Sequence, residues 1–85
     1  MTIENRYDVI TRINDHYGKM SKGQKAISEF IFDHYDQAVF MTAAKLGETV
    51  GVSESTVVRY AMYIGYNGYP EFQRDLEEWV HDKFS

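Results

Sequence analysis

Arg59 and three small hydroxyl side chains are the residues of this sequence best suited to bind a ligand. Ser53, Ser55 and Thr56 lie within one helical turn of one another, and Arg59 follows about a turn later. On a helix that begins near Ser53, the hydroxyl groups would lie at its N-terminal end, where backbone N–H groups favour anions. Arg side chains bind guanine or phosphate, and hydroxyl groups bind phosphate or base edges. This pattern predicts contacts with nucleic acid.

The remaining polar residues do not form the sequence pattern of a catalytic site or of a metal site. The sequence has no Cys, and its three His residues are scattered. Glu77 and His81 share a helix face, but two ligands do not make a tetrahedral site. No nucleophile, base and orienting group occur in a supporting motif. We therefore expect no enzymatic activity, no cofactor and no metal. A small enzyme would need a deep pocket lined by perturbed acids.

Two N-cap residues predict the helices that would position these side chains. Thr42 can cap a helix over 43–50, and Ser53 can cap a second helix over 54–64. Only a short turn separates the two helices. The spacing is that of a helix-turn-helix, in which the N-terminal end of the second helix enters the DNA major groove.

Two glycines fit the same motif. Gly51 would supply the left-handed backbone of the turn, and Gly47 would supply a small residue where the helices touch. The apolar residues expected to pack the two helices together are Leu46, Val50, Val52 and Val57. Spacing alone leaves open an ordinary bundle in which a glycine turn joins two helices.

Apolar residues three or four positions apart predict helices through the rest of the chain. The expected ranges are 5–17, 22–35, 36–40 and 70–83. Tyr7 is expected on the apolar face of the first of these helices, Phe84 is expected to face inward beside the last, and Gly68 suits a positive φ in the turn before it. The fold class expected for residues 1–85 is an all-α compact bundle of five or six short helices in one domain.

Composition limits the alternatives. Hydrophobic residues make up 44% of the 85 residues and aromatics 15%, which is enough for a core and argues against disorder. No apolar run is long enough for a membrane span, and the first residues do not have the pattern of a secretory signal. We expect a cytoplasmic protein without a membrane partner. The net charge of −4 arises mostly in 71–85, which leaves the predicted motif close to neutral.

Three segments resemble, in the same order, the N-terminal domain of the RpiR/MurR family of bacterial transcriptional regulators. They are S-K-x-Q-K-A-I at 21–27, G-V-S-E-S-T-V-V-R-Y at 51–60 and I-G-Y-x-G-Y-x-E-F at 64–72. The resemblance implies a helix-turn-helix domain that binds double-stranded DNA and regulates sugar or sugar-phosphate metabolism. Family members usually continue into a sugar-isomerase-type domain, absent from this chain, and only that domain would bind a sugar-phosphate effector. A homodimer on a palindromic site is also expected, because two recognition helices double the contacts.

Four positions depart from the family pattern. Met62 and Tyr63 occupy the stretch where bases often follow the recognition-helix Arg, and Asn67 replaces a base in the next turn. Gly47 stands where Ala is usual, which would weaken the first helix of the motif by up to ~1 kcal/mol.

The candidate DNA contacts lie on both helices of the motif. They are Thr42, Lys45, Ser53, Glu54, Ser55, Thr56, Arg59 and Tyr63. Arg59 is the foremost candidate, and the alternative is an exposed Arg that pairs with Glu54. Amides after Thr42 can hold a phosphate, Lys45 can reach the DNA backbone, and Glu54 can accept from cytosine N4.

A second function remains open on the sequence alone. The chain would then be a helical protein-interaction module, used for dimerisation, with weak or lost DNA binding. The negative net charge and the missing bases after Arg59 favour this alternative. The salt dependence of duplex binding would separate the two functions, because phosphate neutralisation gives a steep salt slope.

Overall fold

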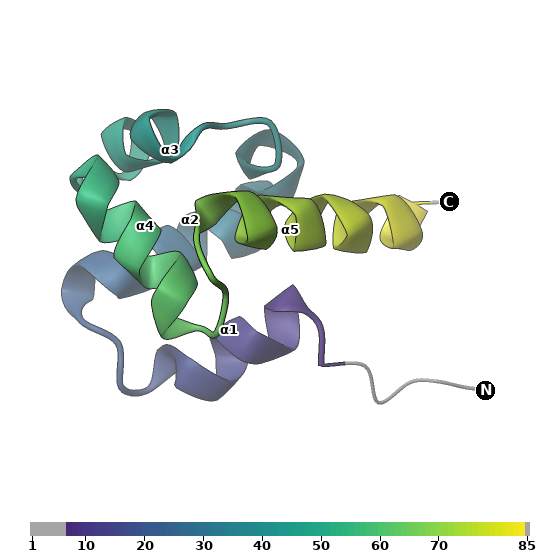
Figure 1. Cartoon of the computed structure of the whole chain (residues 1–85), viewed down its shortest axis with the longest axis horizontal. Helices are drawn as coiled ribbons and strands as arrows, with labels where there is room; N and C mark the ends of the chain where they lie inside the picture. Colours follow the sequence, from purple (N-terminus) through teal and green to yellow (C-terminus); the bar gives the residue numbers. More distant parts are fainter. Residues whose placement is uncertain (1–6, 85) are drawn as a thin grey trace.

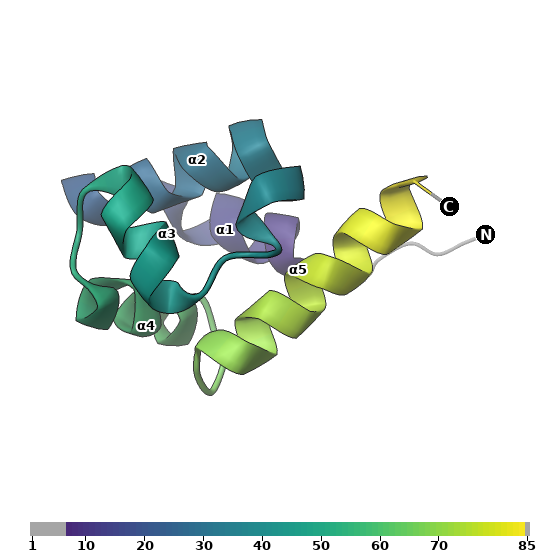
Figure 2. The ribbon, with the colours of Figure 1, turned by 90° about the horizontal axis from the view of Figure 1, so that it is seen from above.

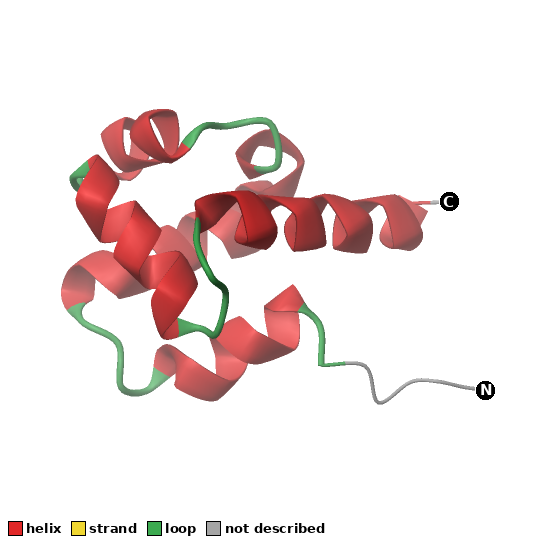
Figure 3. Ribbon diagram, viewed as in Figure 1, coloured by secondary structure: helices red, strands yellow, loops and turns green. Residues whose placement is uncertain are grey.

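The computed structural model describes residues 7–84, and it confirms the all-α prediction with five helices and no strand in this range (Figures 1 and 3). The helices are α1 (Val9–Tyr17), α2 (Lys22–Ala38), α3 (Ala43–Val50), α4 (Glu54–Tyr63) and α5 (Tyr69–Phe84). None of the helices in this range is long and apolar enough to cross a bilayer.

The first helix starts later than the sequence pattern predicts. Its N-cap is Asp8, whose carboxylate accepts a hydrogen bond from the Thr11 backbone N–H at 2.9 Å. Tyr7 therefore precedes the helix and is 49% exposed, so its predicted place on the apolar face is wrong. Asn5, the predicted first residue, lies outside the described residues.

The short separate helix predicted over 36–40 is right in kind but wrong in its bounds. After the Ser21–Gln24 capping box, α2 extends to Ala38, but it consists of two helical segments that meet at a kink, where His34 is non-helical with φ −139° and ψ 43°. The second segment follows His34 and ends at Ala38, so it starts earlier and ends earlier than predicted. Val39 then caps the C-terminus, and Phe40 lies in the loop before α3.

The turn between α4 and α5 places its left-handed residue at the start. Gly65 has φ 104°, whereas Gly68, the predicted position, is not among the residues with positive φ. The reason is the end of α4: the residue just past a helix C-terminus is the one that commonly turns left-handed. α5 begins one residue before Pro70, which the sequence predicts as the first helical residue.

One core joins all five helices. Its fully buried large side chains come from every helix: Val9, Ile13, Ile27, Ile31, Leu46, Val57, Tyr60, Ile64, Phe72 and Leu76. Towards the C-terminus α5 projects beyond the other helices, so Trp79 and Val80 are half-buried and Phe84 is 66% exposed (Figure 2). The expectation that Phe84 faces inward is therefore wrong. α3 and α4 lie together at the opposite end of the molecule (Figures 1 and 2).

Candidate nucleic-acid interface

The turn between α3 and α4 has the geometry that the sequence predicts. Gly51 follows α3 with φ 87° and ψ 29°, in the left-handed region. The backbone N–H groups of Gly51 and Val52 both donate to the Gly47 carbonyl, at 2.8 and 2.9 Å. These bonds satisfy a carbonyl at the end of α3 and reverse the chain within a few residues.

Gly47 lies where α3 meets the backbone that leads into α4. A Cβ atom at this position would be 2.7 Å from the Val52 carbonyl oxygen and 3.2 Å from the Ser53 backbone. Both obstacles are backbone atoms, which a side-chain rotation cannot move away. The predicted role of Gly47 as the small residue at the helix contact is confirmed.

The inner face of α4 is fixed in the core through Tyr60. This side chain is fully buried, and its ring meets that of Phe72 edge-on at 6.1 Å between centroids. Its hydroxyl lies 2.8 Å from the Ser28 hydroxyl on α2, which donates in turn to the Gln24 carbonyl at 3.1 Å. Burial raises the pKa of Tyr60 far above its ordinary value, so the phenol is neutral. Tyr60 is core, as expected, but nothing in the sequence indicates its partner Ser28.

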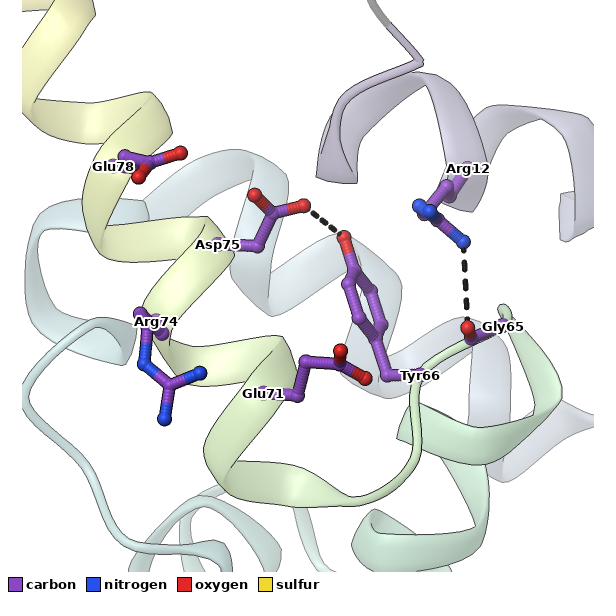
Figure 4. Close-up of a pocket in the computed structure, with 7 residues that line it drawn as sticks. All are labelled: Arg12, Gly65, Tyr66, Glu71, Arg74, Asp75 and Glu78. Atoms are coloured by element: carbon purple, nitrogen blue, oxygen red, sulfur yellow. Dashed lines mark hydrogen bonds between the residues drawn. The ribbon is translucent and has the colours of Figure 1, made fainter.

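The C-terminal end of α4 is held by Arg12 of α1 (Figure 4). One guanidinium nitrogen donates to the Ile64 carbonyl at 3.2 Å and lies 3.5 Å from the Gly65 carbonyl oxygen. The guanidinium also lies over the Tyr66 ring, 4.6 Å from its centroid. A Cβ atom at Gly65 would overlap the Arg12 guanidinium. Glycine therefore permits both the positive φ at this position and the close approach of Arg12.

Tyr66 links the same cluster to α5. Its hydroxyl donates to the Asp75 carboxylate at 2.5 Å, as Figure 4 shows. Burial and the neighbouring carboxylate raise the pKa of Tyr66 well above its ordinary value. Together, Arg12, Tyr66 and Asp75 connect α1, the turn after α4, and α5. No local sequence pattern predicts this cluster, because Arg12 and its acceptor Ile64 lie 52 positions apart.

The outer face of α4 carries the exposed side chains. Ser55, Arg59 and Tyr63 are exposed, and Met62 is 54% exposed. Among the described residues, no ion pair joins Arg59 to Glu54, so the pairing considered for Arg59 does not occur. Tyr63 is 38% exposed, and its ring meets that of His16 edge-on at 5.2 Å.

The other predicted positions of α4 lie at its N-terminal end, where Ser53 caps the helix. The Ser53 hydroxyl accepts from the Thr56 backbone N–H at 3.1 Å and lies 2.9 Å from the Thr56 hydroxyl. Thr56 is half-buried, whereas Glu54 in the first turn is exposed. Ser53 and Thr56 therefore already bind each other, and Ser55 is the hydroxyl of this group that projects outward.

The two predicted positions on α3 lie in its first turn. The Thr42 hydroxyl accepts from the Lys45 backbone N–H at 3.0 Å, so Thr42 is the N-cap. The Lys45 ammonium lies 3.6 Å from a Glu48 carboxylate oxygen, with both side chains largely exposed. Such a pair contributes little to stability and leaves the ammonium accessible.

Titratable side chains do not assemble a metal site in the described part of the chain, where no three His, Asp or Glu residues lie close enough together. The polar features of the α3–α4 end are instead two capped helix N-termini and an exposed Arg. Such groups can bind phosphates and base edges.

Comparison with known proteins identifies the fold family. Residues 7–83 match the helix-turn-helix domain of the rpiR family. The chain is 29% identical over 69 residues to an uncharacterized HTH-type transcriptional regulator, YfhH, of Escherichia coli (81% of this chain, 24% of the relative). It is 28% identical over 71 residues to HTH-type transcriptional regulator HexR of Pseudomonas aeruginosa (84% and 25%) and 31% identical over 61 residues to GlvR of Bacillus subtilis (72% and 24%). The chain thus spans about a quarter of the length of these curated relatives. Because the family match extends over all five helices, the chain belongs to the rpiR family of helix-turn-helix domains.

Proposed function

We propose that the chain binds double-stranded DNA in a sequence-specific way, with α4 in the major groove, as the DNA-binding domain of a transcriptional regulator. The observation that carries the proposal is the division of α4 into two faces. Val57, Tyr60 and Ala61 are fully buried, while Ser55 and Arg59 on the opposite face are exposed. Among residues 7–84, no hydrogen bond or ion pair engages the Arg59 guanidinium, which is therefore available to guanine or phosphate.

Helix N-termini would supply the contacts that orient the domain on the duplex. The amides after Thr42 and Ser53 lie at the positive ends of α3 and α4, where a phosphate would be favoured. Lys45 would contact the DNA backbone from the first turn of α3. Glu54 would accept from a cytosine amino group, and Thr56 and Tyr63 would lie at the edges of the contact.

The functional unit in this proposal is a homodimer on a palindromic site. Two recognition helices would then read half-sites about 34–36 Å apart, one turn of DNA. A sugar-phosphate effector, as the family resemblance implies, would act through a further domain of a longer regulator and not through residues 1–85. The further domain agrees with relatives that are about four times as long as the matched segment.

The test is duplex selection followed by titration. The chain is used to select duplexes from a random pool at low salt, and affinity is then measured on selected and random duplexes at several salt concentrations. Arg59→Ala is expected to cost ~1–3 kcal/mol on the selected duplex if Arg59 contacts guanine. If it binds only phosphate, the loss should be similar on all sequences, and the salt slope should fall by about one.

Lys83→Ala is the matched control, because it removes the same charge from the far end of α5 (Figure 2). Its affinity should equal that of the wild type. Equal binding by wild type and Arg59→Ala on both kinds of duplex would remove Arg59 from the site.

A protein-interaction module is the second candidate function. Two large apolar side chains away from α4 favour it: Phe40 is 82% exposed and Phe84 66% exposed. Exposed apolar surface is common at protein contacts. In this case the chain would self-associate in sedimentation experiments with little salt dependence, and it would bind no duplex even at low salt.

A further inference from the structure

Met62 continues the exposed face of α4 beyond Arg59. Ser55, Val58, Arg59 and Met62 lie at positions i, i+3, i+4 and i+7, which share one face of a helix with 3.6 residues per turn. Met62 is 54% exposed, whereas Val58 is half-buried and packs against the core. The Met62 side chain thus lies beside Arg59 with most of its length available for a ligand.

The same spacing is used by helices that lie along the major groove. Homeodomain recognition helices contact the groove from four positions related as i, i+3, i+4 and i+7. Met62 lies about 4.5 Å further along the α4 axis than Arg59, given a rise of about 1.5 Å per residue. Base pairs are about 3.4 Å apart, so a Met62 contact would fall within one or two base pairs of the Arg59 contact.

The chemistry of the side chain limits what it can recognise there. A thioether is flexible, polarizable and apolar, and it donates no hydrogen bond. The major groove presents hydrogen-bonding groups at every base pair, but its apolar group is the C5-methyl of thymine. A phosphate contact is excluded for the same reason, since Met62 has no charge and no donor.

We propose that Met62 determines specificity by contacting a thymine methyl group within two base pairs of the Arg59 contact. This inference rests on the proposed function, because it places α4 in the major groove. Met62 would thus supply an apolar contact in the stretch where family members often have basic residues.

Replacement of thymine by deoxyuridine, which lacks the C5-methyl, tests the proposal. Each thymine of the selected duplex is replaced in turn, and affinity is measured at fixed salt. For the wild type, one replacement in a half-site should weaken binding about fourfold, the value of one buried methylene-sized group. Met62→Ala removes the contact from both subunits of the dimer, so it should bind the thymine duplex about as weakly as the wild type binds a duplex with uracil at that position in both half-sites, and it should not distinguish the two.

Two variants control for apolar surface in general. Met62→Leu keeps an apolar side chain and should retain the preference for thymine. Phe84→Ala removes an exposed apolar group from the far end of α5 and should bind both duplexes like the wild type.

The contrary results separate this inference from the proposed function. Two results would overturn only the role of Met62 and leave the proposed function standing. In the first, binding depends on salt but no replacement of thymine changes the affinity. In the second, each replacement lowers the affinity of Met62→Ala as much as that of the wild type. Selected sites without thymine near the Arg59 contact would do the same, as would a change in self-association without a change in DNA affinity. Absence of salt-dependent binding to any duplex would overturn both proposals.

Discussion

The hydrogen bond between Ser28 and Tyr60 allows a double-mutant test of how α4 is held. Ser28 can donate to the Gln24 carbonyl at 3.1 Å, and the Tyr60 hydroxyl, 2.8 Å away, then donates to Ser28. Both side chains are fully buried. Tyr60→Phe removes one hydrogen bond but leaves Ser28 with its carbonyl partner, so it should cost ~1 kcal/mol. Ser28→Ala leaves a buried phenol without a partner, so it should cost more, up to ~3 kcal/mol.

The double variant gives the decisive result. Once Ser28 is Ala, replacing Tyr60 with Phe removes the unsatisfied hydroxyl, and apolar groups then face each other. The second substitution should therefore restore stability instead of reducing it further, and the double variant should lie ~1–2 kcal/mol above the sum of the singles.

Urea unfolding at 25 °C measures these free energies, and each kcal/mol should also shift Tm by about 4–8 °C in a domain of this size. Ser55→Ala is the control, because it removes an exposed serine from the outer face of α4 and should lie within about 0.5 kcal/mol of the wild type. Additive costs, or a Ser28→Ala variant milder than Tyr60→Phe, would refute the bond geometry and the inward orientation of Tyr60.

Four further outcomes are expected. Gly51→Val should destabilise by ~1–3 kcal/mol in thermal unfolding, because a β-branched residue at φ 87° is strained; an unchanged Tm would contradict the turn. Gly18→Ala should instead stabilise by ~0.4–1 kcal/mol, because Gly18 has φ −62° and space for a Cβ atom; destabilisation would mean that its surroundings are tighter than described. Burial raises the pKa of Tyr69 to about 12, above the ordinary value of 10.0, so its stabilising contribution is complete below pH 10 and is lost as the pH rises towards 12. Urea unfolding across this range, followed with tyrosinate absorbance, should show that loss, and constant stability would be the contrary result. Calorimetric titration of the chain with sugar phosphates should show no micromolar binding; such binding would place an effector site within residues 1–85.

The helix-turn-helix could be predicted because its signals are local. Thr42 and Ser53 bond to amides three residues away, and Gly51 bonds within its own turn, so short stretches of sequence contain the whole interaction. The start of α1 has such a signal as well, because Asp8 is the N-cap and lies three residues before Thr11, whose amide it binds. The predicted start at residue 5 follows from the apolar spacing and not from this cap.

The errors and omissions arise where distant parts of the chain meet. The break between the two helical segments of α2 falls at His34, slightly before the predicted start at 36, because apolar spacing does not fix the residue at which a helix is interrupted. Phe84 follows the helical pattern of α5 and its ring centroid lies 6.0 Å from that of Tyr35 on α2, but this one contact leaves it 66% exposed. The roles of Arg12 and Ser28 depend on partners 52 and 32 positions away. No local sequence pattern indicates that a polar side chain will find a hydrogen-bond partner from a distant part of the chain.

The contacts behind α4 also limit how this domain can be re-engineered. Because Ser28 holds the middle of α4 and Arg12 its C-terminal end, transplanting residues 42–65 alone into another scaffold would leave a buried phenol and two carbonyls without their partners. If α4 reads DNA as proposed, a change of target sequence should therefore be attempted on the outer face, at Ser55, Arg59 and Met62. A library restricted to those three positions would vary the surface offered to DNA while the fold that presents it stays constant.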